Sequence, residues 1–504
     1  MTTEISLPGN IRDTVEQFQQ QEEVFQWTKQ WYPVAVVDFL DSSRPHAMQL
    51  LGKDIVLWRD GANKWRCFED RCPHRLVPLS EGRVESDGTL LCAYHAWRFD
   101  SQGNCVNIPQ SQNKQTEAKN CSSTRSCAVA YPTQECQGLL WVWSESGSQA
   151  QQESQLRSPR IIPELENISD KVVQLSWNIR DLPYGWDFFM ENVADPAHVP
   201  VSHHGIIGNR YKDAKYYDMK RVRNVSTQDG FSFEITPTAP NIEQAVHDFQ
   251  PPCHMRIVTS NTDGGKLILA LYATPTRPGW CRHIGCQVLV KNNAGQKPNG
   301  LGFFGLPMPN WLIHVLSSLF LHQDLVFLHY QQKILERRKD KWLNAVYTPN
   351  PQDKMVITFR QWLETRAGGG VPWAAEARLA SEEGDKQKLF DVWTTHTQHC
   401  KVCQDALKNF NRLSVSAYVA AAVCLFVGVI VDARAMAVKV AIASLAPEAI
   451  ASSQQTGDSI LAVIPPASFW LAIGGAILFA VVGYQLKRFS RLFYIYKFEH
   501  ARND

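Results

Sequence analysis

The chain has 504 residues, and its 51 Lys and Arg nearly balance its 49 Asp and Glu, which leaves a net charge of +2. This balance provides no basic surplus, so nucleic acid is excluded as a partner. A chain of this length needs more than one folding unit, and a hydrophobic content of 44% is ordinary for globular proteins. Thirteen Cys without a preceding secretory signal predict a reducing compartment and mostly free or metal-bound thiols.

The residue pattern predicts four parts and an α+β fold. Residues 1–25 are polar and form a lead. Residues 26–145 contain short β-type runs separated by turn residues, which is typical of a small antiparallel β domain. A polar stretch over 145–159 predicts a linker. Residues 160–410 mix strands with helices, of which Asp324–Lys341 is the clearest helix, and predict a mixed α/β domain.

The tail, residues 411–504, predicts a two-helix membrane hairpin. Residues 415–431 carry no charge over 17 positions and residues 467–486 none over 20, and about 20 apolar residues cross a bilayer. The alternative is a pair of buried helices in a soluble domain. Basic residues precede the first segment and follow the second: Lys408, Arg412, Lys487, Arg488 and Arg491. Because cytoplasmic ends carry excess Lys and Arg, the large N-terminal part should face the cytoplasm.

Two matched pairs, Cys72-x-His74 and Cys92-x-x-His95, predict a metal site. Zinc is one candidate, but zinc fingers usually group like ligands, whereas each pair here is mixed. In a Rieske [2Fe–2S] centre, two Cys hold one iron and two His hold the other. Two loops that each supply one Cys and one His meet that need, so we expect a Rieske cluster.

A second constellation lies in 191-ENVADPAHVPVSHHG-205, where His198 and His203 are five positions apart. Non-heme Fe(II) oxygenases bind iron with two His and one carboxylate on one face, which leaves positions for O₂ and substrate. Taken alone, the two His are equally well surface or core residues. About 100 residues after a Rieske motif, they predict a mononuclear Fe(II) site.

These motifs together resemble the Rieske non-heme iron oxygenase α-subunit family, over roughly residues 26–410. The resemblance rests on WYPVAVVDFL, CPHR, CAYHAW and Glu-Asn-x-x-Asp-Pro-x-His-x₄-His. It implies a helix-grip-like catalytic domain with His198 and His203 as iron ligands. It also implies that Asp195 bridges an iron-binding His to a cluster His of the neighbouring subunit in a homotrimer. Ala96 departs from the family, which usually has Gly after the last cluster ligand.

The family's third iron ligand is a carboxylate far downstream, and Asp324 in 321-LHQDLVFLHYQQ-332 fits it best. No Lys or Arg stands within four positions of Asp324, so a local salt bridge is not its obvious purpose. Glu336 and Asp340 are rivals on the same helix. The alternative is an acidic residue favoured by the helix dipole. His204 has no ligand role in the family and is interpreted as structural or substrate-facing.

A narrower resemblance joins SHHGIIGNR, QDLVFLHYQQ, THTQHCKVC and the paired apolar tail. Together they look like the pheophorbide a oxygenase branch, which includes the inner-envelope translocon Rieske protein and its protochlorophyllide-linked relative. The branch implies a tetrapyrrole substrate, O₂, a ferredoxin-type reductant and a lipid membrane. Since the start lacks a transit-peptide bias, we expect the thylakoid or plasma membrane of a photosynthetic prokaryote. A redox-sensing component of a membrane complex, without oxygenase turnover, is the alternative.

The last motif is Cys400-x-x-Cys403, preceded by His396 and His399. One Cys-x-x-Cys is compatible with a dithiol switch, a partial metal site or two ordinary thiols. The resemblance to the branch favours a redox switch.

Overall fold

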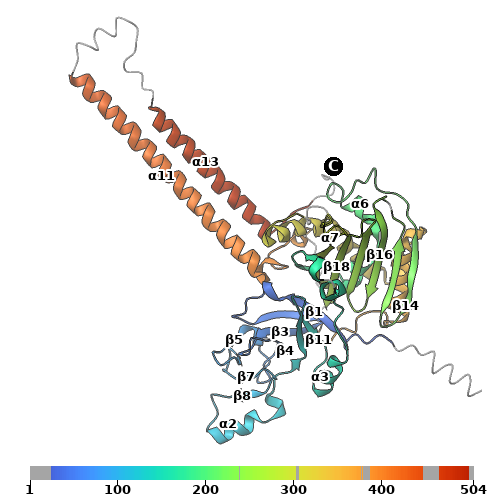
Figure 1. Ribbon diagram of the computed structural model, residues 1–504. Helices are drawn as coiled ribbons and strands as arrows, with labels where there is room; N and C mark the ends of the chain where they lie inside the picture. Colours follow the sequence, from blue (N-terminus) through green and yellow to red (C-terminus); the bar gives the residue numbers. More distant parts are fainter. Residues whose placement is uncertain are drawn as a thin grey trace, which may run out of the picture. The chain divides into compact units, whose positions relative to one another are not determined.

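The computed structural model in Figure 1 describes residues 24–167, 169–237, 239–301, 306–375, 377, 386–445 and 465–498. The predicted polar lead over 1–25 therefore lies, up to residue 23, outside the described residues. The chain divides into two compact units, which are Met1–Lys401 with Lys497–Asp504, and Val402–Tyr496.

The first unit begins with three small antiparallel sheets, as the short β-type runs predict. Their strands are β1 (Trp31–Val36), β2 (His46–Leu50), β3 (Lys53–Arg59), β4 (Trp65–Glu69), β5 (Arg83–Val84), β6 (Leu90–Leu91), β7 (Arg98–Phe99), β8 (Cys105–Asn107), β9 (Ala130–Tyr131), β10 (Thr133–Cys136) and β11 (Leu139–Trp143). They pair in the orders β1-β11-β10, β2-β3-β4-β9 and β5-β6-β7-β8. Trp58, Phe68, Leu90 and Phe99 are fully buried and form one apolar cluster with the thiols of three Cys. This core supports the loops that follow β4 and β6.

The polar stretch predicted as a linker contains a helix, α3 (Ser148–Gln155). Ala, Gln and Glu are strong helix formers, and a linker prediction from polarity alone overlooks that propensity. The indole of Trp31 donates to the Ser154 carbonyl at 3.1 Å. This bond holds the helix against the β domain. Two further short helices in this part of the chain are α2 (Lys114–Cys121) and α4 (Pro163–Asn167).

A large antiparallel sheet forms the rest of the first unit. Its strands are β12 (Val172–Gln174), β13 (Asn178–Leu182), β14 (Met219–Ser226), β15 (Gly230–Ile235), β16 (Ile242–Gln250), β17 (His254–Asn261), β18 (Lys266–Arg277) and β19 (Trp280–Val290). The order is β12-β19-β18-β17-β16-β15-β14, and β13 also pairs with β19. Gly279 closes the β18–β19 hairpin with φ 71°, a conformation that glycine adopts without steric cost.

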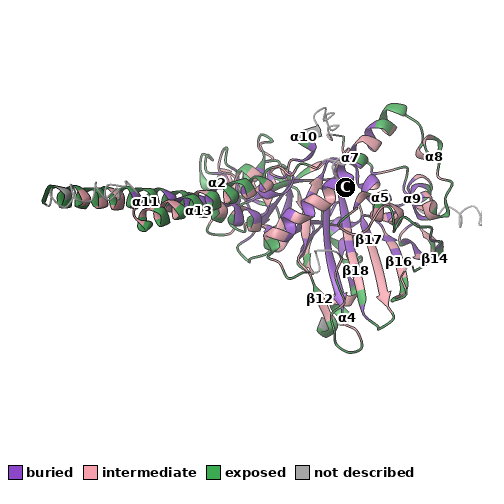
Figure 2. Ribbon diagram, turned by 90° about the horizontal axis from the view of Figure 1, so that it is seen from above, coloured by how far each residue is buried: buried purple, intermediate pink, exposed green. Residues whose placement is uncertain are grey.

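Helices cover this sheet and carry the candidate iron ligands. They are α5 (Trp186–Ala194), α6 (Val199–Ser202), α7 (Asn310–Arg338), α8 (Trp342–Ala345), α9 (Lys354–Thr365) and α10 (Lys386–Leu389). Helix α5 packs against α7, α9 and the sheet. The sequence predicts a helix only from Asp324, but α7 begins fourteen positions earlier because the apolar run before Asp324 continues the same helix. In Figure 2 much of the sheet and of α5 is coloured as buried.

The second unit consists mainly of two antiparallel helices, α11 (Lys401–Leu445) and α13 (Ala467–Ser490), which lie side by side in Figure 1. Small residues line their contact. A Cβ added to Gly428 would lie 3.2 Å from Ala472, and one added to Gly483 would lie 3.2 Å from the carbonyl oxygen of Ser414. The Ser414 hydroxyl donates to the Gly483 carbonyl at 2.8 Å. Such close backbone approach is typical of helix pairs in membranes.

Three helices among the described residues are long and apolar enough to cross a membrane: α7, α11 and α13. They differ in burial, because 67% of the apolar window of α7 is buried, against 22% in α11 and 11% in α13. Helix α7 is thus a core helix of the first unit. Helices α11 and α13 are coloured largely as exposed in Figure 2, and many of their exposed residues are apolar.

Candidate metal centres

The loops that carry the two Cys/His pairs have the same backbone conformation. The Cys72 loop follows β4, and the Cys92 loop lies between β6 and β7. In each loop the Cys N–H donates to the carbonyl five residues later, and the N–H four residues later donates back to the Cys carbonyl. The pairs are Cys72–Val77 (2.8 Å), Leu76–Cys72 (2.8 Å), Cys92–Trp97 (2.9 Å) and Ala96–Cys92 (3.0 Å). Local hydrogen bonds therefore fix the backbone conformation of both loops.

Each loop includes one residue in the left-handed region, Leu76 with φ 61° and Ala96 with φ 56°. For a residue with a Cβ this conformation costs roughly 1–2 kcal/mol. Ala96 occupies the position where the family usually has Gly. The Cys92 loop therefore holds steric strain that Gly would remove.

The side chains at the loop tips fit a Rieske cluster. Cys72 and Cys92 are each 1% exposed, and the His74 and His95 rings lie 4.5 Å apart between centroids. Within the described part of the chain, the buried Nδ1 of His74 has no hydrogen-bond partner. The hydrogen bond with the Cys72 thiol lowers the pKa of Cys92, and the N–H groups of Tyr94 and His95 also donate to its sulfur. Sulfurs that accept such bonds are suited to bind metal as thiolates.

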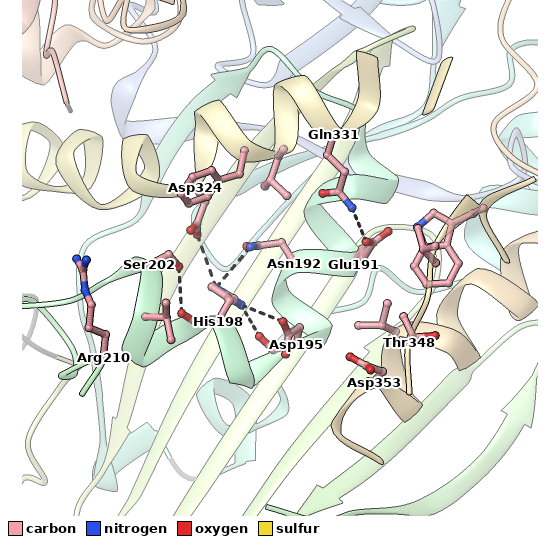
Figure 3. A pocket seen from close by; sticks show the side chains of 16 residues that line it. Glu191, Asn192, Asp195, His198, Ser202, Arg210, Asp324, Gln331, Thr348 and Asp353 are labelled. Carbon is pink, nitrogen blue, oxygen red and sulfur yellow. Dashed lines mark hydrogen bonds and ion pairs between the residues drawn. The ribbon is translucent and has the colours of Figure 1, made fainter. Parts of the chain in front are cut away.

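His198 and His203 of the second constellation converge with Asp324, and Figure 3 shows His198 between Asp324 and Asp195. His198 ends a 3₁₀ turn, His203 follows α6, and Asp324 lies on α7. The Asp324 Oδ2 atom lies 3.1 Å from His203 Nε2 and 3.7 Å from His198 Nε2. One ligand atom from each of these three residues lies within 4.8 Å of the others. Two His and one carboxylate at this spacing fit a mononuclear iron site.

Both imidazoles are oriented by the nitrogen that faces away from Asp324. Nδ1 of His198 lies 2.5 Å from the backbone carbonyl of Asp195. Nδ1 of His203 lies 2.9 Å from Oε1 of Gln323. Since both partners are acceptors, each Nδ1 carries the proton, and each Nε2 lone pair points towards Asp324. Metal-binding His residues are commonly oriented in this way.

The Asp324 carboxyl is buried and remains ionised. Burial alone raises its pKa, but the neighbouring His203 and His198 imidazoles together hold the pKa below the usual value for Asp. An anionic oxygen beside two neutral imidazoles is the donor set that a divalent iron requires. The two predicted rivals lie elsewhere: Glu336 bonds Gln332 at 2.6 Å and Asp340 bonds Arg338 at 3.0 Å.

Glu191, the first residue of the predicted constellation, supports the site instead of joining it. It is 9% exposed on α5, and its carboxylate accepts from Arg360 on α9 at 2.6 Å and from Gln331 on α7 at 2.8 Å. Arg360 also donates to Asp187 at 2.6 Å. This buried network joins the helix before His198 to the helix that carries Asp324. Sequence reasoning missed Arg360, which has no motif of its own.

Asp195 lies beside His198 without facing Asp324. Its Oδ1 accepts from the Ala197 N–H at 2.8 Å, and its Oδ2 lies 3.8 Å from Nδ1 of His198. Burial raises the pKa of the Asp195 carboxyl above the usual value, although His198 acts in the opposite direction. The neighbouring His204 accepts from the Arg210 N–H at 3.1 Å, which favours the structural interpretation of His204.

Two cavities meet at His198. One has a volume of about 310 Å³, and its wall includes the iron face, which is formed by His198, His203 and Asp324. Most of its other lining residues are apolar, among them Ile257, Leu267, Leu269, Leu271, Ile313 and Phe320. The other cavity, of about 620 Å³, is lined by several polar groups, including Asp195, Arg210 and Asp353. Apolar cavities with a few polar groups are typical sites for organic substrates.

The Cys400-x-x-Cys403 motif groups with only one of the two His residues that precede it in the sequence, and with one distant His residue. Cys400 and Cys403 are grouped with His396 and with His314, which comes from α7. His399, although adjacent in sequence, is not part of this group and bonds Gln398. Sequence reasoning missed His314, because 81 positions separate it from the nearest partner and no local spacing marks it.

Comparison with known proteins agrees with this geometry. A model of the Rieske [2Fe-2S] domain matches residues 30–126, and a model of pheophorbide a oxygenase matches residues 249–342. Pheophorbide a oxygenase of Oryza sativa is 32% identical, covering 78% of this chain and 75% of its own. Flavonoid 8-hydroxylase 2 of Ocimum basilicum is 31% identical, covering 79% and 77%. The structure of the Pseudomonas putida CBB5 NdmA QL mutant with caffeine aligns with a TM-score of 0.51 at 20% identity, covering 67% and 90%.

Proposed function

Because the chain belongs to the pheophorbide a oxygenase family of Rieske non-heme iron oxygenases, we propose that it oxygenates a tetrapyrrole with O₂ and electrons from a ferredoxin-type donor. The observation that carries this proposal is the position of His198, His203 and Asp324 on the wall of an apolar cavity. Iron bound by these three residues supplies the oxygen chemistry, and the Rieske cluster supplies electrons.

The cavity wall suits a largely apolar ring system. Its Leu and Ile side chains exclude water, and its buried His side chains add polarity without charge. Burial lowers the pKa of His247 and of His283 to about 4, so both are neutral at physiological pH. A neutral imidazole can donate or accept one hydrogen bond at the edge of a substrate and thereby orient it.

The substrate class is tested by product analysis with labelled oxygen. The reduced full-length protein is incubated with ¹⁸O₂ and, in separate reactions, with pheophorbide, chlorophyllide, protochlorophyllide and a flavone. We expect ¹⁸O in a tetrapyrrole product. Label in the flavone product alone would assign the chain to flavonoid hydroxylation, as the name of its Ocimum relative suggests. Reversible cluster reduction without label in any product would indicate a redox-sensing component and contradict the proposal.

We further propose that Asp195 links His198 to a cluster-binding His of a neighbouring subunit in a homotrimer. Asp195 contributes to the walls of both cavities beside His198. At the tips of the Rieske loops, Leu76 is 67% exposed and Tyr94 is 58% exposed, which is unusual for such apolar side chains and suits a docking surface. Rings of head-to-tail subunits bring one chain's loops to the next chain's site.

An Asp195→Asn variant tests this link. We expect it to keep both kinds of iron and the trimer, measured by metal analysis and light scattering, while turnover is lost. Asp353→Asn is the matched control because Asp353 lines the same polar cavity. Normal turnover in Asp195→Asn, or a monomeric active enzyme, would contradict the proposal.

Helices α11 and α13 are proposed as a membrane anchor with the catalytic unit on the cytoplasmic side, in the thylakoid or plasma membrane of a photosynthetic prokaryote. Their exposed apolar length and the basic residues outside the two uncharged segments support this orientation. We expect the full chain to resist alkaline extraction from membranes. In vesicles with the cytoplasmic face inside, added protease should leave the catalytic unit intact. Release by alkali would contradict the anchor, and degradation would contradict the orientation.

A further inference from the structure

A second group of buried Cys and His side chains lies apart from the iron face. It consists of His314, His396, Cys400 and Cys403, each at most 4% exposed. One ligand atom from each residue lies within 4.8 Å of the others. His314 comes from α7, whereas the other three come from eight consecutive residues that end in the first turn of α11. The proposed oxygenase reaction uses none of these side chains.

Both imidazoles of this group are held by their outer nitrogen. His314 Nε2 lies 3.1 Å from the Trp177 carbonyl, and His396 Nδ1 lies 2.6 Å from the Ile179 carbonyl. Because a carbonyl only accepts, each of these nitrogens carries the proton. The lone pair therefore resides on the other nitrogen of each ring, and for His314 this atom lies 3.7 Å from the Cys400 sulfur. Structural metal sites orient their His ligands through backbone carbonyls in this way.

The two thiols lie at the N-terminus of α11. Cys400 immediately precedes the first residue of α11, and Cys403 lies in the first turn of that helix. The partial positive charge at a helix N-terminus stabilises thiolates. Three positions separate the two Cys, a spacing at which both sulfurs reach one ion.

We propose that His314, His396, Cys400 and Cys403 bind one Zn²⁺ in a closed, structural site. Zinc prefers four thiolate and imidazole ligands in tetrahedral geometry, and a structural site leaves no position for water or substrate. The burial of all four side chains meets that condition. The site is separate from the iron face, although His314 and Asp324 lie on the same helix, ten positions apart. The ion would thus join His314 on α7 to the segment 396–403.

Metal analysis of the full chain in detergent tests the proposal. We expect about one zinc per chain in addition to about three irons, two in the cluster and one mononuclear. X-ray absorption at the zinc edge should give two sulfur neighbours at about 2.3 Å and two nitrogen neighbours at about 2.0–2.1 Å. Zinc with nitrogen and oxygen neighbours only would be an ion in the iron face and would overturn the proposal. Iron and zinc are measured independently, so an inactive enzyme that holds zinc contradicts only the proposed function.

Two variants and two controls locate the ion. His396→Ala and Cys403→Ser should each lower zinc from about one per chain to near zero. His399→Ala is the matched control in the same segment and should retain zinc. Cys72→Ser should also retain zinc. The Rieske loops offer the same kinds of ligand, so loss of zinc in this variant would place the ion in those loops instead. If the first two variants do not fold, the absorption edge of the native chain still decides.

The dithiol switch expected from the sequence is the competing outcome. A disulfide between Cys400 and Cys403 in freshly isolated, zinc-free protein would overturn the zinc site. Equal zinc loss in His399→Ala and His396→Ala would also overturn it. With zinc bound, both thiols should resist alkylation until a chelator is added.

Discussion

The Rieske loops and the iron face use similar ligands but are built in opposite ways. All four cluster ligands lie within 24 consecutive residues, on two loops closed by their own backbone hydrogen bonds. The iron face joins His198 and His203 to Asp324 across more than 120 residues. Its geometry depends on α7 and on the network of Glu191, Arg360 and Gln331. A locally built site should tolerate distant substitutions, whereas a site built from distant segments should not.

The largest expected effect comes from Asp324→Ala. Two neutral imidazoles hold Fe(II) poorly without the anionic oxygen, so mononuclear iron and turnover should both be lost. The Rieske absorption should remain, since its loops do not depend on α7. Glu336→Ala is the control on the same helix and should keep iron and activity. Iron that stays in Asp324→Ala and leaves in Glu336→Ala would move the third ligand to Glu336.

Arg360→Met tests the long-range support. It leaves Glu191 and Asp187 without their cation, and a broken buried ion pair typically costs about 3–5 kcal/mol. On mild heating, mononuclear iron should be released at a lower temperature than in the native protein, while the Rieske spectrum persists. Arg338→Met removes an exposed pair with Asp340 and should change stability by less than about 0.5 kcal/mol. Simultaneous loss of both centres in Arg360→Met would show that they do not differ in the way proposed.

Acid should weaken the catalytic part through buried His254, which stacks on Tyr272. Burial lowers the pKa of His254 to about 3. Between about pH 6.5 and pH 3 the unfolded chain therefore binds a proton at this residue, whereas the folded chain does not. The free energy of unfolding should therefore fall as the pH drops from 6.5 towards 3. In His254→Gln the slope should be shallower by up to about 1.4 kcal/mol per pH unit. Urea titrations at several pH values measure it, and parallel curves would contradict the assignment.

The smallest effect is expected from Ala96→Gly, which acts only within one Rieske loop. Relief of the left-handed strain should stabilise the loop by about 1 kcal/mol, so the cluster absorption should bleach more slowly on heating. Ala47→Gly, at an exposed position of strand β2, should have the opposite sign, because Gly weakens a regular strand by about 0.5–1 kcal/mol. Faster bleaching in Ala96→Gly would indicate that the loop benefits from stiffness.

The same distinction explains what could be predicted from the sequence. The α+β fold and the family are correctly predicted from the sequence, because the Rieske ligands and the His198–His203 pair each lie within a short segment with recognisable spacing. Asp324 required the resemblance to the family, since three acidic residues on one predicted helix compete until the fold brings one to the His pair; Asp340 in fact lies beyond the end of α7. Arg360 and His314 were missed because their roles arise only when distant helices pack together. Helix α3 within the predicted linker was not predicted, because the polarity of residues 145–159 hides their helix propensity.

The position of the apolar helices late in the chain has a consequence for biosynthesis. Helix α11 begins at Lys401, so at least four hundred residues are made before the first proposed membrane segment. At about 5–20 residues per second, that takes roughly 20–80 s, which is ample for domain folding. The catalytic unit can therefore fold, and receive its iron, in water before α11 and α13, the proposed anchor, enter the lipid. Their glycine-lined contact then needs no help from the rest of the chain, since it lies wholly between these two helices.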